Sequence, residues 1–421
     1  MTSFLFPKIA TIIQKFDQKH LPNVDLALQD EIQRNNDLIK KTAGKKIAVC
    51  VGSRGIAKIS SIVGVLINQL KSAGAQPFLV PAMGSHGGGT VEGQLSILAD
   101  YGITESKIGA PLIASMETVE IGLTEDNVPV HLDRAAYESD GIILVNRVKP
   151  HTDFKGKAES GLMKMVAVGL GNIDGASHLH RFTPSLGYER LIISKAQVLL
   201  KTEKVLMGLA VIENAYHQTA HVELIPANNI VKREQELLVW AKELMPSLPS
   251  PLIDLLIINR IGKNISGTGL DPNVTGRWFG FNSLWQDTPN IHRIALLDLS
   301  EEAHGNAVGL GLADFCTQRL VDKMDQRATY LNALTAHFTV PAKIPMYFST
   351  DEETIRRALL SLDGTSLPKD KRVIRIKDTL SLTKFEASES LLPELKDHPN
   401  IVEVGKLRPF VFQSDKSMAS F

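Results

Sequence analysis

The apolar residues of the first half of the chain follow a pattern typical of strands that alternate with helices. A buried strand is expected at residues 47–51, and a helix follows because apolar residues recur at helical spacing from Ile59 to Leu70. A second strand that runs into glycines is expected within residues 76–89, and Thr90 is placed to cap a second helix. This order of elements predicts a parallel sheet with right-handed crossovers.

The same pattern returns at residues 140–151 and 204–221, with a helix expected at 188–202 between them. Residues 244–252 are rich in proline and serine, which is typical of a linker. The second half starts again with strands expected within 254–269, 292–307 and 371–379 and a helix through 310–324. We therefore expect two α/β domains, 1–245 and 252–421. The first holds a mostly parallel sheet with flanking helices, the second is smaller, and the active site lies in the cleft between them.

The composition favours small-molecule chemistry. Apolar residues make up 43% of the chain and charged residues 22%, as in ordinary globular proteins, and 46 basic residues balance 46 acidic ones. This balance argues against nucleic acid or a membrane as the partner, and no apolar run is long enough to span a bilayer. The two cysteines, Cys50 and Cys316, are expected to be buried and unpaired. A cytoplasmic protein is expected, and assembly into a homo-oligomer stays open.

Polar residues follow each expected strand of the first half. Arg54 comes after the first strand, His86 lies in a glycine-rich turn after the second, and His151 follows Pro150 after the third. Ligands of open parallel sheets bind beyond the carboxyl ends of the strands, so these three side chains are expected to converge. The two imidazoles suit proton transfer at neutral pH, although each one alone is also typical of a surface turn.

Three further residues allow more than one interpretation. Lys164 lies among apolar residues, where an amine is either modified, neutralised, or extended from a helix to solvent. His178 and His180 are two positions apart, so they would share a face of a strand, and either could ligate a metal from a loop. Together with Glu213 they make a weak metal site, which would suit a metal-dependent lyase or dehydratase.

A longer ordered series of residues carries a family resemblance. An arginine after the first strand and a histidine after the second are followed by a Pro-His pair, a Ser-Gly-x-x-Lys segment and a further histidine. These residues are Arg54, His86, His151, Ser160, Gly161, Lys164 and His180. The series resembles the nickel-pincer lactate racemase family, and the match covers most of the first half of the chain.

The resemblance implies an isomerase that racemises or epimerises a 2-hydroxy acid through a 2-keto acid. Its cofactor would be the nickel-pincer nucleotide, pyridinium-3,5-bisthiocarboxylic acid mononucleotide nickel, which accepts the hydride of the substrate. On this mapping Lys164 is the tether, His180 the protein ligand of nickel, and His86 and His151 the alternating acid and base. Arg54 would bind the substrate carboxylate or help to hold the cofactor, and Ser53, Ser160 and Gly161 would contact the cofactor.

Departures from the family pattern point away from lactate itself. Val51 stands where the family has an acidic residue, and three extra residues separate His151 from Lys164. In the second half Arg277 stands in for a family lysine, and the role of His304 is open. A different or bulkier 2-hydroxy acid is therefore expected. A binding protein that holds the cofactor or an acidic small molecule without turnover is the remaining alternative.

Overall fold

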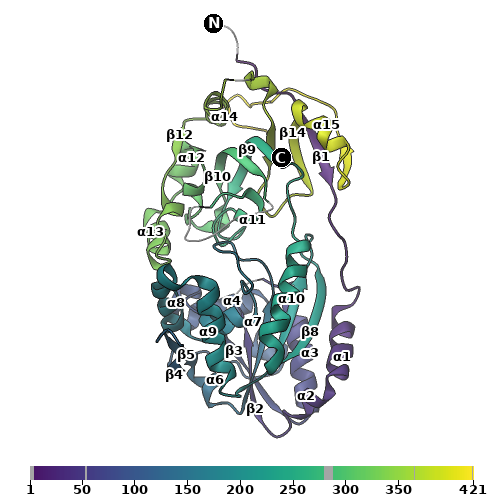
Figure 1. The fold of residues 1–421 in the computed structure, drawn as a ribbon, viewed down its shortest axis with the longest axis vertical. Helices are drawn as coiled ribbons and strands as arrows, with labels where there is room; N and C mark the ends of the chain where they lie inside the picture. The colour runs from purple at the N-terminus through teal and green to yellow at the C-terminus, as the bar shows by residue number, and fades with distance from the viewer. Residues whose placement is uncertain (1–3, 53–54, 279–287, 365, 420) are drawn as a thin grey trace. The chain divides into compact units, whose positions relative to one another are not determined.

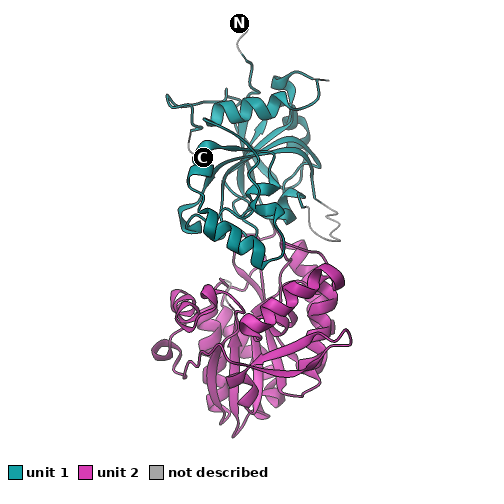
Figure 2. Ribbon diagram, turned by 90° about the vertical axis from the view of Figure 1, so that its left-hand side faces the viewer, with its two compact units in different colours: residues 1–16, 246–421 teal, residues 17–245 magenta. Residues whose placement is uncertain are grey.

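A computed structural model describes residues 4–52, 55–278, 288–364, 366–419 and 421 of the chain. The chain divides into two compact units: Asp17–Met245, and Met1–Phe16 together with Pro246–Phe421 (Figure 2). The division after Met245 falls in the proline-rich segment expected to be a linker. The amino-terminal boundary differs from the expected one. Strand β1 (Ile9–Gln14) pairs with strands of the carboxyl-terminal unit, and a local pattern does not tell which sheet a strand joins.

The sheet of unit 17–245 has five strands in the order β3-β2-β6-β7-β8, of which β2, β3 and β8 are labelled in Figure 1. The strands are β2 (Lys46–Val51), β3 (Gln76–Pro81), β6 (Gly141–Arg147), β7 (Val205–Glu213) and β8 (Thr219–Pro226). The first four in sheet order run parallel, and β8 is antiparallel to β7. The expected mostly parallel sheet is therefore confirmed.

Helices cover both faces of this sheet, because its central strands are apolar on both sides. Ala48 and Cys50 of β2 pack with the helices of one face, whereas Ile47 and Val49 pack with those of the other. The first face is covered by α6 (Arg134–Glu138), α7 (Leu162–Lys164), α8 (Asn172–Leu186), α9 (Tyr188–Leu200) and α10 (Ile230–Glu243). The second is covered by α1 (Val24–Arg34), α2 (Asn36–Lys40), α3 (Ile59–Ser72), α4 (Val91–Asp100) and α5 (Glu105–Ile108). A hairpin of β4 (Thr118–Leu123) and β5 (Pro129–Asp133) lies apart from the main sheet.

The other unit holds an eight-stranded mixed sheet in the order β12-β11-β10-β9-β13-β14-β1-β15. Its remaining strands are β9 (Leu252–Ile261), β10 (Asn290–Leu299), β11 (Phe315–Thr317), β12 (Met346–Phe348), β13 (Val373–Ile376), β14 (Lys384–Ser388) and β15 (Ile401–Val404). Its helices are α11 (Pro272–Thr275), α12 (Gln318–Asp322), α13 (Gln326–Thr335), α14 (Asp351–Leu360) and α15 (Leu392–Lys396). The two-domain α/β class is confirmed.

The helix expected through residues 310–324 is wrong in its first half. Phe315–Thr317 forms β11, which pairs in parallel with β10, and only Gln318–Asp322 is α-helical. A short apolar run fits a buried strand as well as a buried helix, and pairing with a neighbouring strand decides between them.

Two expectations from composition can be compared with the structure. Cys50 and Cys316 are both buried and unpaired, as expected. Among the helices of the described residues, none combines the length and the apolar character that a bilayer crossing requires.

Candidate active site

The candidate site lies at the carboxyl edge of the five-stranded sheet, where the chain leaves β2 and β6. In the sheet, β2 lies between β3 and β6, so the chain leaves β2 toward one neighbour and β6 follows on the opposite side. Ligands of open parallel sheets bind at the carboxyl ends of the strands where the strand order changes direction in this way. Arg147 at the end of β6 pairs with Glu213 at the end of β7. Glu213 also accepts a hydrogen bond of 2.5 Å from the amide of Ala57. This bond fixes the chain at Ala57. Ser53 and Arg54, two predicted site residues, lie outside the described residues.

The loop that follows β6 holds His151 in a fixed setting. The buried carboxylate of Glu159 accepts hydrogen bonds from the amides of His151 (2.7 Å) and Gly156 (3.1 Å). The same carboxylate pairs with Lys242 of α10 at 2.6 Å. The amide of Asp153 donates to Nδ1 of His151 at 2.9 Å. The imidazole is therefore oriented by backbone contacts on one side of the ring.

The other ring nitrogen of His151, Nε2, contacts Nζ of Lys164. Because Nδ1 accepts the amide hydrogen of Asp153, the neutral imidazole carries its proton on Nε2. An Nε2–H donor needs a lone pair on its partner, and an ammonium group has none. The contact therefore suits a neutral Lys164 amine, which is the form that acts as a nucleophile.

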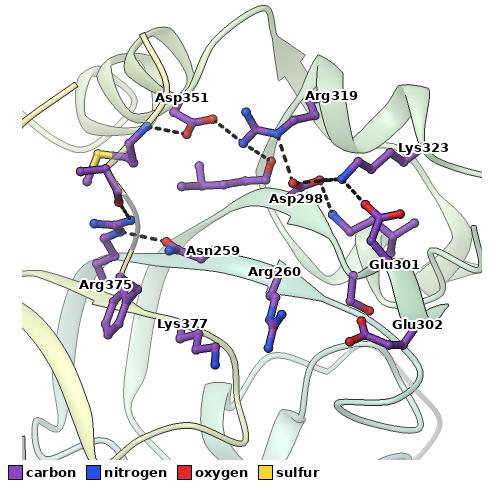
Figure 3. A pocket seen from close by; sticks show the side chains of 16 residues that line it. Asn259, Arg260, Asp298, Glu301, Glu302, Arg319, Lys323, Asp351, Arg375 and Lys377 are labelled. Atoms are coloured by element: carbon purple, nitrogen blue, oxygen red, sulfur yellow. Dashed lines mark hydrogen bonds and ion pairs between the residues drawn. The ribbon is translucent and has the colours of Figure 1, made fainter. Parts of the chain in front are cut away.

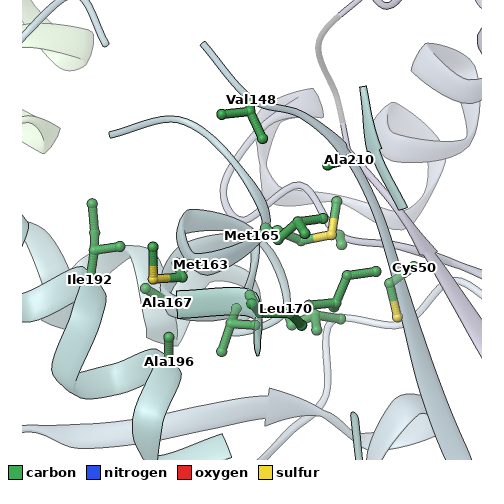
Figure 4. Close-up of a cluster of buried hydrophobic side chains, with 14 of the residues drawn as sticks. Cys50, Val148, Met163, Met165, Ala167, Leu170, Ile192, Ala196 and Ala210 are labelled. Atoms are coloured by element: carbon green, nitrogen blue, oxygen red, sulfur yellow. The ribbon is translucent and has the colours of Figure 1, made fainter. Parts of the chain in front are cut away.

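Lys164 owes its position to its apolar neighbours. It ends the short helix α7, and Met163 and Met165 on either side are 0% and 3% exposed. Figure 4 shows both methionines within the core beneath the sheet edge. Burial of these neighbours turns the intervening lysine toward the loop of His151. The structure thus favours an engaged amine over the alternative of a lysine that only extends to solvent.

A π-helical turn after Lys164 brings the loop of His86 to this edge. The turn spans Met165–Gly169 and closes through a hydrogen bond of 2.8 Å from the amide of Leu170 to the carbonyl of Met165. π-Turns of this kind are frequent at functional sites. The amide of Gly84 donates to the carbonyl of Gly169 at 2.9 Å, so the glycine-rich loop after β3 packs on the turn. His86 is exposed on that loop.

Substitution of Gly169 by alanine is expected to destabilise the protein by about 1–3 kcal/mol, the usual cost of overpacking. An added Cβ would lie 2.5 Å from the carbonyl oxygen of Ala82, so the π-turn or the end of β3 must shift. Gly64 inside α3 is the matched control, because a Cβ there meets nothing within 4 Å and alanine favours a helix. Urea unfolding measures the free energy of unfolding of both variants. A Gly169→Ala variant as stable as Gly64→Ala would contradict the packing described here.

The two histidines at positions 178 and 180 do not share a face, contrary to the expectation for a strand. They lie on the helix α8, where a separation of two residues turns side chains by about 200°. His178 stacks on His131 of β5, with ring centroids 4.9 Å apart. His180 instead faces the ring of Tyr188 at 6.3 Å.

Tyr188 links the two predicted site histidines, and the sequence analysis missed it. Its ring stacks on Phe154 at 4.5 Å and lies 6.2 Å from His151 and 6.3 Å from His180, measured between centroids. Burial, and secondarily the negative charge of Asp153, raises the pKa of the Tyr188 hydroxyl. His151 and His180 thus both border the aromatic pair of Phe154 and Tyr188, and Lys164 contacts His151. Nothing in the local pattern indicates that Tyr188 is a site residue, because it is simply the first residue of an amphipathic helix.

The trio of His178, His180 and Glu213 is not brought together. His178 is engaged with His131, and Glu213 with Arg147. Within the part of the chain that the structure describes, no three histidine, cysteine, aspartate or glutamate side chains are arranged to hold a metal ion. The geometry therefore gives no support to a lyase that uses these three residues.

A charged cavity of about 530 Å³ lies in the other unit, at the carboxyl ends of β9 and β10 (Figure 3). Its charges largely pair with one another: Arg319 contacts Asp351 at 2.9 Å, and Lys323 contacts Glu301 at 2.9 Å. No predicted site residue lines it. Arg277, the expected replacement for a family lysine, pairs with Asp314 of the same unit at 2.9 Å.

Fold and site together define a two-unit α/β protein with an amine–imidazole pair at a sheet edge. Residues 11–186 match the family model of the lactate racemase N-terminal domain. This part of the chain is therefore similar to the lactate racemase family, as its motifs indicated, and the similarity supports racemase activity in general. All the predicted catalytic, cofactor-binding and metal-binding residues lie within the matched range.

One solved structure shows the same fold. The lactate racemase apoprotein from Thermoanaerobacterium thermosaccharolyticum is similar to this chain with a TM-score of 0.54 and 12% sequence identity. The similarity covers 89% of this chain and 99% of that protein. A comparison with curated proteins gives no significant match.

Proposed function

We propose that the protein is a racemase or epimerase of a 2-hydroxy acid other than lactate. The observation that carries the proposal is the contact between Lys164 and His151, at the sheet edge of a domain that matches the lactate racemase family. An amine that lies beside an imidazole and between apolar neighbours is suited, when neutral, to acylation rather than to an ion pair.

The residues of the site fit a tethered nickel-pincer nucleotide. Lys164 would hold it through its amine and His180 would offer an imidazole to nickel, with Ser53, Ser160 and Gly161 alongside. When bound, the cofactor supplies a hydride acceptor. The site also fits because His180 and His151 border the same half-buried ring of Tyr188.

The chain itself supplies substrate binding and proton transfer. Arg54 would bind the substrate carboxylate with two parallel hydrogen bonds, while His86 and His151 would exchange a proton with the substrate hydroxyl. Acylation ties up the lone pair of Lys164 Nζ, so Nε2 of His151 loses this acceptor and can turn to the substrate. To accept a proton at Nε2, the ring must carry its own proton on Nδ1. The bond from Asp153 must therefore open once Lys164 is loaded.

Turnover in heavy water tests the reaction type. We expect a 2-hydroxy acid to be racemised with hydrogen, not deuterium, at Cα of the product, because hydride is returned within the site. The assay uses protein co-expressed with the enzymes that make the cofactor, a panel of 2-hydroxy acids that includes lactate, and nuclear magnetic resonance of the product. Deuterium at Cα would show proton abstraction instead and would overturn the proposal. Binding without any change of configuration across the panel would identify a binding protein.

A further inference from the structure

A buried carboxylate on helix α10 meets the start of the segment that carries Lys164. Glu234 is 1% exposed, and its Oε2 accepts a hydrogen bond of 3.0 Å from the amide of Met163. The amide of Leu162 bonds to the same carboxyl group. Helix N-termini carry free amides and favour a negative charge, so Glu234 caps α7 from a different helix.

Gly161 makes room for this contact. A Cβ at this position would lie 2.5 Å from the carboxyl carbon of Glu234 and 2.6 Å from its oxygens. From β6, the side-chain amide of Asn146 donates to the carbonyl of Gly161 at 2.8 Å. The residue before α7 is therefore held from both sides, by β6 and by α10. The close approach of Glu234 thus explains why the Ser-Gly-x-x-Lys segment has a glycine at position 161.

The same helix also holds the loop of His151. Lys242 lies about 12 Å further along α10, given a rise of about 1.5 Å per residue, and pairs with Glu159 at 2.6 Å. Glu159 in turn accepts the amide of His151. One helix thus anchors both segments whose side chains meet, the loop of His151 and the helix of Lys164.

Burial of the Glu234 carboxylate costs free energy, because the charged group loses its hydration. Desolvation raises the pKa of Glu234 to about 7, although the two amide hydrogen bonds act in the opposite direction. Among the described residues, Oε1 has no hydrogen-bond partner. An apolar side chain of similar size would avoid both costs, so packing alone does not explain a glutamate here.

We propose that Glu234 is a positioning residue that holds the Lys164 amine against His151 by fixing the first turn of α7. The proposal rests on the proposed function only in treating Lys164 as the attachment point of the cofactor. The position and reactivity of the amine are properties of the chain itself.

The test compares the acetylation rate of Lys164 in cofactor-free protein between variants. The reagent is a limiting amount of an acetyl ester, and peptide mass spectrometry gives the ratio of Lys164 to the exposed Lys157 as internal standard. Glu234→Leu removes the acceptor of two amide hydrogen bonds and is expected to lower this ratio about tenfold, while urea unfolding checks that the variant folds. Glu243→Leu, at an exposed position of the same helix, is the control and should leave the ratio unchanged.

Glu234→Gln provides a second variant that keeps the shape of the side chain and removes its charge. It is expected to lower the ratio in the same direction by a smaller factor. A wild-type ratio in either folded variant overturns the positioning role, whether or not the protein racemises any substrate. If the ratio falls but the cofactor never attaches to Lys164, the proposed function fails and the positioning role stands.

Discussion

The Lys164→Arg variant is expected to fold normally and to lose racemisation by at least about 10³-fold. Arginine keeps a long aliphatic stem with a basic end group, but its guanidinium does not become a neutral nucleophile in a protein. Without a covalent tether the cofactor must be bound from solution, whereas tethered reactants reach effective molarities of about 10⁵ M or more. Initial rates with each enantiomer, measured on protein co-expressed with the cofactor pathway, give the effect.

Lys157→Arg is the matched control, since Lys157 is an exposed lysine of the preceding loop. It should racemise at the wild-type rate. Circular dichroism and the unfolding midpoint check that both variants fold. Wild-type rates in a Lys164→Arg variant that folds would remove Lys164 from the reaction.

His151→Gln is expected to lower kcat by about 10²–10⁴-fold, the usual contribution of a positioned acid or base. Racemisation requires a proton at the substrate hydroxyl to be removed and then returned, so both directions should slow. A glutamine amide can still contact Lys164, but it does not exchange protons at neutral pH. Steady-state kinetics with each enantiomer as the starting substrate give kcat and KM separately.

His178→Gln serves as the histidine control, because His178 stacks on His131 and does not meet Lys164. Its kcat should stay near the wild-type value. If His178→Gln lost activity and His151→Gln retained it, the metal-dependent lyase would regain support and the role of His151 would be wrong.

The first half of the fold could be predicted because each strand is a short apolar run and each helix an amphipathic one. β2, α3, β3 and α4 begin and end within a few residues of the expected positions, and the Thr90 side chain accepts the amide of Gly93 as a cap should. The ends of parallel strands meet at one edge, so the neighbourhood of His151 and the loop of His86 followed from topology.

The helix that carries His178 and His180, α8, was not predicted because its local sequence is unfavourable for a helix. α8 contains Gly175, Thr183 and Pro184, all poor helix formers, so its sequence resembles a loop. Packing against the hairpin and α9 overrides these preferences. Residues 1–16 were assigned to the first domain, because the pairing partners of β1, nearly 400 residues away, leave no trace in a local pattern.

The contacts that orient the site could not be predicted from one sequence. Glu234 reaches Met163 across 71 positions, and the amide of Asp153 sets the tautomer of His151 through the backbone, where residue type carries no signal. Tyr188 could not be predicted as a site residue either, because an aromatic residue at the start of an amphipathic helix is common. Motifs predicted the reactive groups, whereas the orientation of these side chains comes from tertiary contacts.

The most direct test of the central claim is the mass of the intact protein and of its peptides, together with its nickel content, after co-expression with the enzymes that make the cofactor. We predict an added mass on the peptide that contains Lys164, nickel in proportion to the modified fraction, and neither in the Lys164→Arg variant. Protein that racemises a 2-hydroxy acid while its Lys164 peptide has an unmodified mass would contradict the account.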